Sequence, residues 1–259
     1  MERLAVIKQL RAAGVECFTR DEWGTVRSSE YIKRRRTHPM PSGPANYHFL
    51  HITVTNDTDS VLEGKAGARQ IESFGLSSPP MVSYQDLVTN EGKYFQGQDY
   101  GTKGTHTIND KGIKGFPNDL NLQGYALAIM QNVEDEVSDV QVELIAKVFA
   151  ARELAGYVKK GANVYPHRTF AYKACPGDKA VARLPEIVRR KNELVKAGSI
   201  KGKAPIKVVI PPKPPTRQEI AADALERLKK ADSSGNSRGS KLLRTAKQAL
   251  NKMKPAKKR

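Results

Sequence analysis

Cysteine is scarce in this sequence, since only Cys17 and Cys175 occur among 259 residues. Two thiols cannot build the disulfide framework that stabilises many small secreted domains, so the fold must rest on a hydrophobic core. Hydrophobic residues make up 39% of the chain, which is enough for such a core. Synthesis in a reducing compartment would keep these thiols free, which suits the role as a thiolate that we consider for Cys175 below.

Long apolar runs are absent as well. No stretch of about 18 apolar residues occurs, and we therefore expect no membrane-spanning helix. Residues 1–11 are charged throughout and lack the apolar segment of a secretory signal peptide. These two absences predict a soluble protein that is made without an export signal.

Acidic residues are outnumbered, and the chain carries a net charge of +17. Residues 205–259 hold 15 Lys and Arg against 4 Asp and Glu, a net charge of +11, and the other residues contribute +6. Basic tails bind polyanions such as nucleic acid, anionic membrane or anionic cell-wall polymers. This tail has no interleaved aromatic residues, and the chain has no helix-turn-helix or zinc-finger spacing, so we expect no specific nucleic-acid binding.

The composition changes along the chain divide it into three parts. Residues 1–204 are long enough for one good-sized domain. Residues 205–215 are proline-rich and predict an extended linker. Residues 216–259 begin with a capping box and contain two narrow apolar stripes, which predict a small helical hairpin or a segment that is disordered alone.

Hydrophobic periodicity and turn residues predict the order of the elements in the first part. Residues 27–46, including Lys33-Arg34-Arg35-Arg36, are expected to form a long, solvated polar connection, and residues 97–123 a long surface loop. Pro185 should break or kink the last helix. The predicted helices are 1–14, 63–74, 138–160 and 179–196, and the predicted strands are 47–55, 81–89 with a hairpin turn at 90–92 into 93–96, and 124–131.

The segment from His167 to Cys175 carries the clearest chemistry. Imidazole and thiolate are common zinc ligands, and the Cys-Pro-Gly turn that begins at Cys175 can fold both side chains onto one ion. A lone His or a lone Cys is more often a structural residue than a metal ligand. Two ligands do not make a metal site, so a third must come from elsewhere in the chain. His51, at the end of a predicted buried strand, is the best candidate, whereas His48 should point to the opposite face of that strand.

These residues lie in motifs that resemble the zinc-dependent N-acetylmuramoyl-L-alanine amidases of type 2, a family that includes bacteriophage endolysins and peptidoglycan recognition proteins. The resemblance covers about residues 19–190. The chain departs from the family pattern at Gln85, where His is common, and at Ile52, where His, Cys or Asn is common. The motifs are Arg20-Asp21-Glu22-Trp23-Gly24, Phe49-Leu50-His51-Ile52-Thr53, the Tyr-bearing strand 83–92, the strand 121–127, and His167 with Lys173-Ala174-Cys175-Pro176-Gly177.

The resemblance implies an α/β fold with a central mixed β-sheet flanked by helices, and it implies residue roles. His51, His167 and Cys175 would bind zinc in an open three-ligand site. Tyr84 and Lys173 would be catalytic, although a strand tyrosine without this context is more often a packing residue. His106 would contact substrate at the rim, or would simply be exposed on a surface loop.

The implied function is that of an endolysin, a hydrolase that cleaves the amide between N-acetylmuramic acid and L-alanine in bacterial peptidoglycan. The alternative is a non-catalytic peptidoglycan-binding module, against which the presence of Cys175 and Tyr84 argues. We expect a monomer that stays in the host bacterial cytoplasm until lysis and then reaches the cell wall. The basic tail would contact anionic wall polymers.

Overall fold

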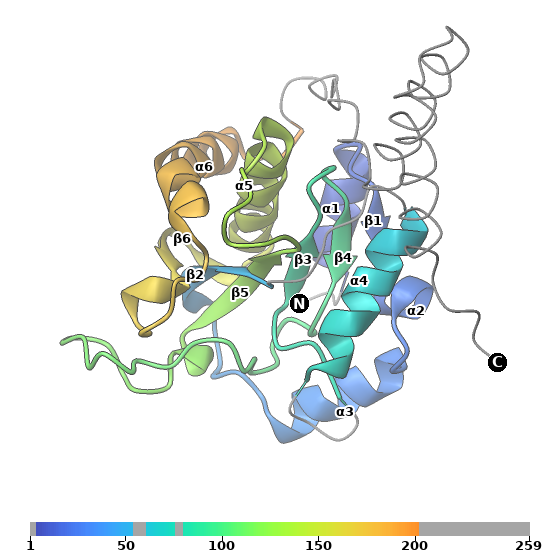
Figure 1. Cartoon of the computed structure of the whole chain (residues 1–259), viewed down its shortest axis with the longest axis horizontal. Coiled ribbons are helices and arrows are strands. Elements are labelled where there is room, and N and C mark those ends of the chain that lie inside the picture. Colours follow the sequence, from blue (N-terminus) through green and yellow to red (C-terminus); the bar gives the residue numbers. More distant parts are fainter. Residues whose placement is uncertain (1–3, 54–60, 76–79, 202–259) are drawn as a thin grey trace, which may run out of the picture. The chain divides into compact units, whose positions relative to one another are not determined.

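The computed structural model describes residues 4–53, 61–75 and 80–201. These residues form the predicted α/β fold, with a central mixed sheet flanked by helices (Figure 1). Val54 and Thr55 of the first predicted strand, and the predicted linker and basic tail at 205–259, lie outside the described residues. Within the described part, no helix is long and apolar enough to cross a membrane.

The sheet has six strands in the order β1-β4-β3-β5-β2-β6. Strands β3, β5, β2 and β6 run parallel to one another, β4 is antiparallel to β3, and β1 is parallel to β4. Because β2 is parallel to both of its neighbours, β5 and β6, the segments that follow these three strands emerge at the same edge of the sheet. The strands are β1 (Cys17–Phe18), β2 (Ala45–Ile52), β3 (Asp86–Val88), β4 (Tyr94–Gln96), β5 (Gly124–Ile129) and β6 (Val158–Pro166).

Helices cover both faces of the sheet, and strand residues alternate between them. One face packs on α1, α5 and α6 in a core that includes Leu50, Leu127 and Ile129. The other face packs on α2 and α4 through residues such as Leu87 and Ala128. The helices are α1 (Ala5–Ala12), α2 (Arg20–Trp23), α3 (Ser28–Thr37), α4 (Val61–Ser73), α5 (Asp139–Leu154), α6 (Asp178–Ala197) and the short 3-10 turns η1 (Leu120–Leu122) and η2 (His167–Thr169).

The predicted helix 138–160 is too long, because α5 ends at Leu154. The amides of Gly156 and Tyr157 turn back onto the carbonyls of Glu153 and Arg152, in the pattern that closes a helix on a left-handed glycine. Gly156 has a φ of 75° and supplies that conformation. The residues assigned to the end of the helix instead open β6, an edge strand that the sequence analysis missed. The predicted N-cap at Ser138 with Gln141 in a capping box is confirmed.

The predicted polar connection 27–46 is wrong in part, since α3 occupies Ser28–Thr37. This helix has little apolar patterning, and its one buried aromatic side chain is Tyr31. The Tyr31 hydroxyl lies 3.2 Å from Glu72 Oε1 and accepts a hydrogen bond from the amide of Val82 at 3.2 Å. Tertiary contacts of Tyr31 therefore help to stabilise a helix that the sequence pattern did not predict.

The predicted surface loop 97–123 is not confined to the surface, because part of it reaches into the molecule. It contains η1, and several of its polar residues are buried, among them Thr102, Thr107 and Asn121. The hairpin between β3 and β4 is confirmed, but β3 covers only the last part of the predicted strand 81–89. Pro185 does not end α6, which continues through it.

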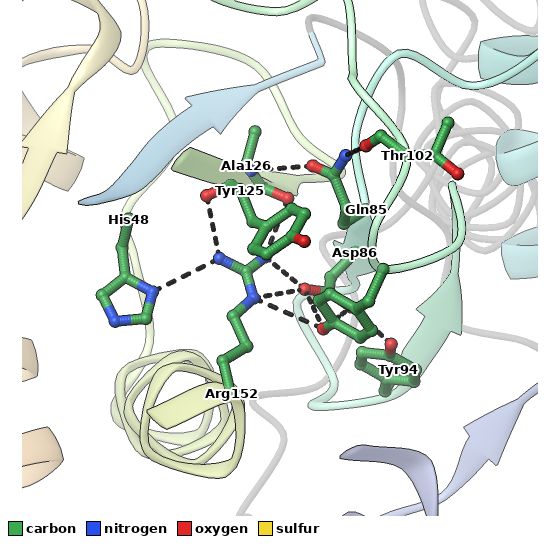
Figure 2. Close-up of polar contacts among 9 residues, drawn as sticks. His48, Gln85, Asp86, Tyr94, Thr102, Tyr125, Ala126 and Arg152 are labelled. Atoms are coloured by element: carbon green, nitrogen blue, oxygen red, sulfur yellow. Dashed lines mark hydrogen bonds and ion pairs between the residues drawn. The ribbon is translucent and has the colours of Figure 1, made fainter. Parts of the chain in front are cut away.

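Beneath one face of the sheet, a buried guanidinium ties α5 to three strands (Figure 2). Arg152 pairs with Asp86 of β3 and donates to the carbonyl oxygens of Tyr125 and Ala126 in β5, at 2.9 and 2.8 Å. Its Nη1 also lies 3.4 Å from Nδ1 of His48 in β2. These bonds fix the relative positions of the strands that carry the candidate site on the opposite face.

Candidate metal centre

His51 is the last but one residue of β2, a strand that is buried on both faces. It pairs in register with Ala128 of β5. Side chains alternate along a strand, so His51 and Phe49 share one face, while His48, as predicted, points to the other. His51 is 1% exposed and thus stands in the interior, close to the carboxyl end of the strand.

His167 and Cys175 lie on the segment that follows β6. His167 begins η2, and the chain then returns, with the amide of Arg168 donating to the carbonyl of Cys175 at 2.8 Å. Gly177 has a φ of 90°, and a Cβ there would collide with the carbonyl of Val133, so only glycine fits this turn. The turn brings the thiol to the end of β2, where the Ile52 amide donates to Sγ at 3.3 Å.

These three side chains form one compact group. One ligand atom from each of His51, His167 and Cys175 lies within 4.8 Å of the others. Nδ1 of His51 is 3.8 Å from Sγ of Cys175, and the two imidazole centroids are 4.3 Å apart. Among the described residues this is the group of His, Cys and carboxylate side chains that is arranged to hold a metal ion.

Burial sets the protonation states of the three residues. Burial, and then the positive charge of Lys173, lowers the pKa of His167 to about 4. Burial lowers the pKa of His51 well below its usual range. Burial raises the pKa of Cys175 to about 11, against the opposing effects of the Ile52 amide and of the Lys173 charge. Both imidazoles therefore offer lone pairs at neutral pH, and the thiol ionises when a cation replaces its proton.

The donor set fits zinc. Two neutral imidazoles and one thiolate are ligands that zinc prefers, and three protein ligands are typical of catalytic sites, in which a fourth position stays open. Nδ1 of His167 is buried and has no hydrogen-bond partner among the described residues. A buried, unpartnered nitrogen is costly unless a ligand completes it.

Tyr84 and Lys173 lie beside this group. The ring centroids of Tyr84 and His51 are 5.2 Å apart, and burial raises the pKa of the Tyr84 phenol, which therefore remains protonated. Lys173 is exposed, but its charge is close enough to lower the pKa of His51, His167 and Cys175. The structure thus gathers the five residues that the sequence analysis named as metal ligands or catalytic groups.

His106 is buried, so the alternative of simple surface exposure is wrong. Its ring lies 5.7 Å from that of His51 and 5.6 Å from that of Phe49, between centroids. Burial lowers the pKa of His106 to about 3, which keeps the ring neutral. Contact with substrate stays a prediction.

A cluster of aromatic rings, Phe49, Phe116 and Phe170, lies beside the candidate metal ligands and forms what we call the aromatic wall. Phe170 packs edge-on against Phe49 and Phe116, with centroids 6.0 and 4.9 Å apart. Lys111 joins the two loops that build this wall, because its Nζ donates to the carbonyl of Arg168 at 2.6 Å and its amide to that of Phe170 at 3.0 Å. The side chains of Tyr172, Ile108 and Ile113 are exposed on the same loops.

Gln85, which replaces the histidine common in the resembled family, has a structural role. Its Nε2 donates to the carbonyl of Thr102 at 3.2 Å, and its Oε1 accepts from the amide of Ala126 at 2.9 Å (Figure 2). Gln85 therefore links β5 to the loop that carries His106. Because it follows Tyr84 directly, these bonds also fix the backbone from which the tyrosine projects.

Thr107 and Asn121 escaped the sequence analysis. Thr107 Oγ1 is 3.0 Å from Nε2 of His51, and Asn121 Oδ1 accepts the amides of His106 and Thr107 at 2.6 and 2.9 Å. Neither residue type signals metal binding, and their partners lie far away in the sequence. The position of Thr107 directly after a candidate histidine was the one available hint.

No protein-family model matches the sequence, and no curated protein matches it. Solved structures do match the fold. The bumblebee peptidoglycan recognition protein PGRP-SA is similar with a TM-score of 0.53 and 21% identity, over 64% of this chain and 90% of that one.

Two further structures are complexes. The ectodomains of PGRP-LCa and PGRP-LCx bound to tracheal cytotoxin match with a TM-score of 0.53 and 18% identity, over 64% of this chain and 92% of theirs. Human PGRP-IBETAC in complex with a muramyl pentapeptide matches with a TM-score of 0.50 and 17% identity, over 63% of this chain and 90% of that one. At these identities the likeness shows that this chain has the fold of the peptidoglycan recognition proteins.

Proposed function

We propose that this protein is a zinc-dependent N-acetylmuramoyl-L-alanine amidase that acts on bacterial peptidoglycan. One observation carries the proposal, namely the convergence of His51, His167 and Cys175 on a single point, with ligand atoms within 4.8 Å of one another. These residues would hold the zinc ion. A module that only binds peptidoglycan has no need of a thiol and two imidazoles arranged in this way.

Bound zinc would polarise a water molecule and the scissile carbonyl, the usual chemistry of an open zinc site. The exposed Lys173 ammonium would stabilise negative charge that develops on the carbonyl oxygen, and the effect of its charge on the pKa of His167 supports this role. Tyr84 keeps its proton, because burial raises the pKa of the phenol, and it can orient the attacking water by hydrogen bonding. Each residue therefore acts on the reacting groups rather than on the metal.

The proposed substrate class follows from the fold and from the wall beside the site. Two similar structures carry tracheal cytotoxin and a muramyl pentapeptide. Here the exposed Tyr172, Ile108 and Ile113 next to the metal ligands offer apolar surface to a peptide stem. His106 would contribute at the inner end of that surface.

Digestion of purified peptidoglycan with mass analysis of the products tests the proposal. We expect muropeptides with a free amino group on L-alanine, and no products with the variant Cys175→Ser. New reducing sugar ends would indicate a glycosidase instead. Retention of the protein on peptidoglycan without any cleavage would favour the non-catalytic binding module.

We further propose that the enzyme is a phage-type endolysin whose tail contacts anionic polymers of the wall. The support is the charge of the tail, 15 Lys and Arg against 4 Asp and Glu in residues 205–259, beyond a proline-rich linker. A second contact of this kind raises the effective concentration of an enzyme at its substrate.

Truncation after Ala204 tests the tail. Hydrolysis of small soluble muropeptides should be unchanged, because the proposed catalytic residues all precede residue 204. Binding to intact walls should fall, and the deficit should shrink as salt rises, because exposed charges are screened within about 8–10 Å at physiological ionic strength. Equal wall binding by both proteins at low salt would rule out the contact.

A further inference from the structure

One hydroxyl group lies between two histidines at the metal centre. Oγ1 of Thr107 is 3.0 Å from Nε2 of His51 and 3.1 Å from Nδ1 of His106. Thr107 is 2% exposed, and its backbone is held by Asn121, whose Oδ1 accepts its amide at 2.9 Å. The hydroxyl is thus fixed between the two rings and shielded from solvent.

The protons in this chain of three groups depend on one another. A neutral imidazole carries a single N–H, and a hydroxyl donates one hydrogen bond while it accepts others. If His51 donates from Nε2 to Thr107, the hydroxyl proton is free to donate to Nδ1 of His106. If His51 instead carries its proton on Nδ1, the hydroxyl donates to His51, and His106 must donate from Nδ1.

The metal site selects between these two arrangements. Nδ1 of His51 faces Sγ of Cys175 at 3.8 Å, so this nitrogen is the one that can share an ion with the thiolate. A metal ligand needs its lone pair, which leaves the proton of His51 on Nε2. A second hydrogen bond of this type commonly orients a metal-binding histidine and raises the basicity of the ligand.

We propose that Thr107 is a positioning residue that holds His51 in the Nε2–H form for metal binding and thereby sets His106 in its Nε2–H form. This inference rests on the proposed metal site. Nε2 of His106 is buried and has no partner among the described residues, and it lies against Gly104, where a Cβ would collide with the ring. The relay leaves an N–H donor at that position, where the other tautomer would leave a lone pair.

The first test measures metal affinity in three variants by competition with a chelator. Thr107→Val keeps the branched shape but removes the acceptor, and loss of such a partner weakens metal binding by about 10–100-fold. Thr107→Ser keeps the hydroxyl and should bind zinc as the parent does. Thr105→Val is the matched control, since the Thr105 hydroxyl is exposed and bonds to Ser83 Oγ at 2.9 Å rather than to a histidine.

The second test needs no variant and reads the tautomers directly. In the full chain loaded with ¹¹³Cd and labelled with ¹⁵N-histidine, long-range proton–nitrogen correlation spectra distinguish protonated from unprotonated ring nitrogens. We expect cadmium coupling at Nδ1 of His51 and protons at Nε2 of both His51 and His106. In Thr107→Val, His106 should lose its preference for the Nε2–H form.

The outcomes separate this inference from the proposed function. Parent-like zinc affinity in Thr107→Val, or a proton on Nδ1 of His106 in the cadmium-loaded parent, would overturn the inference and leave the amidase proposal intact. A Thr107-dependent metal site in a protein that cleaves no peptidoglycan would support the inference and overturn the amidase. A parent chain that binds neither zinc nor cadmium would overturn both. If Thr107→Val does not fold, the spectra of the parent still decide.

Discussion

The two faces of β2 carry histidines three positions apart in opposite situations. His48 is completely buried and has a partner for each ring nitrogen, Glu153 at 3.0 Å and Arg152 at 3.4 Å. Lys191 donates to the same Glu153 oxygen at 2.6 Å, which completes an ionic network. His51 is as deeply buried, but its Nδ1 opens toward a thiol, and the neighbouring His167 has an unpartnered Nδ1.

Residue type and burial are therefore the same on the two faces, and the difference lies in the set of partners. Buried polar groups in folded proteins are normally hydrogen-bonded, so an unpartnered group calls for a particular explanation. Around His48 the partners belong to the chain. On the other face, His51 lies next to a thiol and to a buried nitrogen of His167 that has no partner among the described residues, which is the arrangement expected of a metal site under the proposed function.

The largest effect is expected from Cys175→Ser, which removes a ligand from the His51 face. A hydroxyl is a poor substitute for a thiolate, so zinc affinity should fall by more than the roughly 10–100-fold that loss of an outer partner costs, and hydrolysis should stop. Elemental analysis of the purified protein measures the metal. Cys17→Ser is the control, since Cys17 is buried away from the site. Full zinc occupancy in Cys175→Ser would refute the ligand assignment.

Lys173→Ala and Tyr84→Phe separate catalysis from metal binding on the same face. Loss of a group that stabilises the developing oxyanion lowers turnover by about 10²–10³-fold. Loss of a proton-transfer or orienting group lowers it by about 10²–10⁴-fold. Zinc content and thermal stability should match the parent. Wall lysis at the parent rate in either variant would remove that residue from the mechanism.

Asp86→Asn breaks the network on the His48 face. Removal of one partner from a buried ion pair leaves an uncompensated charge on Arg152 and costs about 3–5 kcal/mol of stability. Denaturant unfolding measures the loss of stability. Glu193→Gln, which breaks an exposed pair with Arg189, should cost only about 0.3–0.5 kcal/mol. Comparable losses in both variants would contradict the distinction between the faces.

The smallest effect concerns pH and His48. Burial lowers the pKa of His48 to about 3, among Glu153, Arg152, Lys191 and Phe149. Between pH 6.5 and pH 3, His48 binds a proton in the unfolded chain but not in the folded chain. The free energy of unfolding therefore falls as the pH drops from 6.5 toward 3. The slope is up to about 1.4 kcal/mol per pH unit for one histidine.

In the variant His48→Gln, the contribution of His48 to the pH dependence of stability should be lost. The contributions of His106 and His167 should remain. Unfolding by denaturant at pH 6.5 and 4.5, with a chelator present, measures the difference between the parent and the variant. Identical pH dependence in the two proteins would show that His48 titrates normally in the folded state.

The candidate metal ligands could be singled out from the sequence because they form short motifs. His167, Lys173 and Cys175 lie within one loop, and His51 ends a strand whose apolar character is visible in the sequence. The residues that complete the site could not be found in this way. Thr107 matters only because folding brings it to His51, 56 positions away, and no spacing rule connects a threonine with a distant histidine.

The fold shows the same limit. The strands β2 and β5 have apolar patterns that identify them. In β6, by contrast, three exposed residues separate buried Val158 from buried Ala162, and this spacing of four resembles a continuation of the preceding helix. Helix α3 depends on Tyr31, whose partners come from α4 and from the segment before β3. Local sequence patterns predicted the elements that bury a continuous apolar face. They failed for elements whose formation depends on contacts with residues far away in the sequence.

The pairing of β2 also has a consequence for the order of folding. Its two neighbours are β5 and β6, with His51 opposite Ala128 and Leu50 opposite Pro166. Both pairings close long loops, and contacts of this kind form slowly because chain entropy must be lost before they stabilise anything. Helix α5 can form from local contacts first. We therefore expect the candidate metal ligands to meet late on the folding pathway, and an ion that binds only the completed set would stabilise the native state without accelerating its formation.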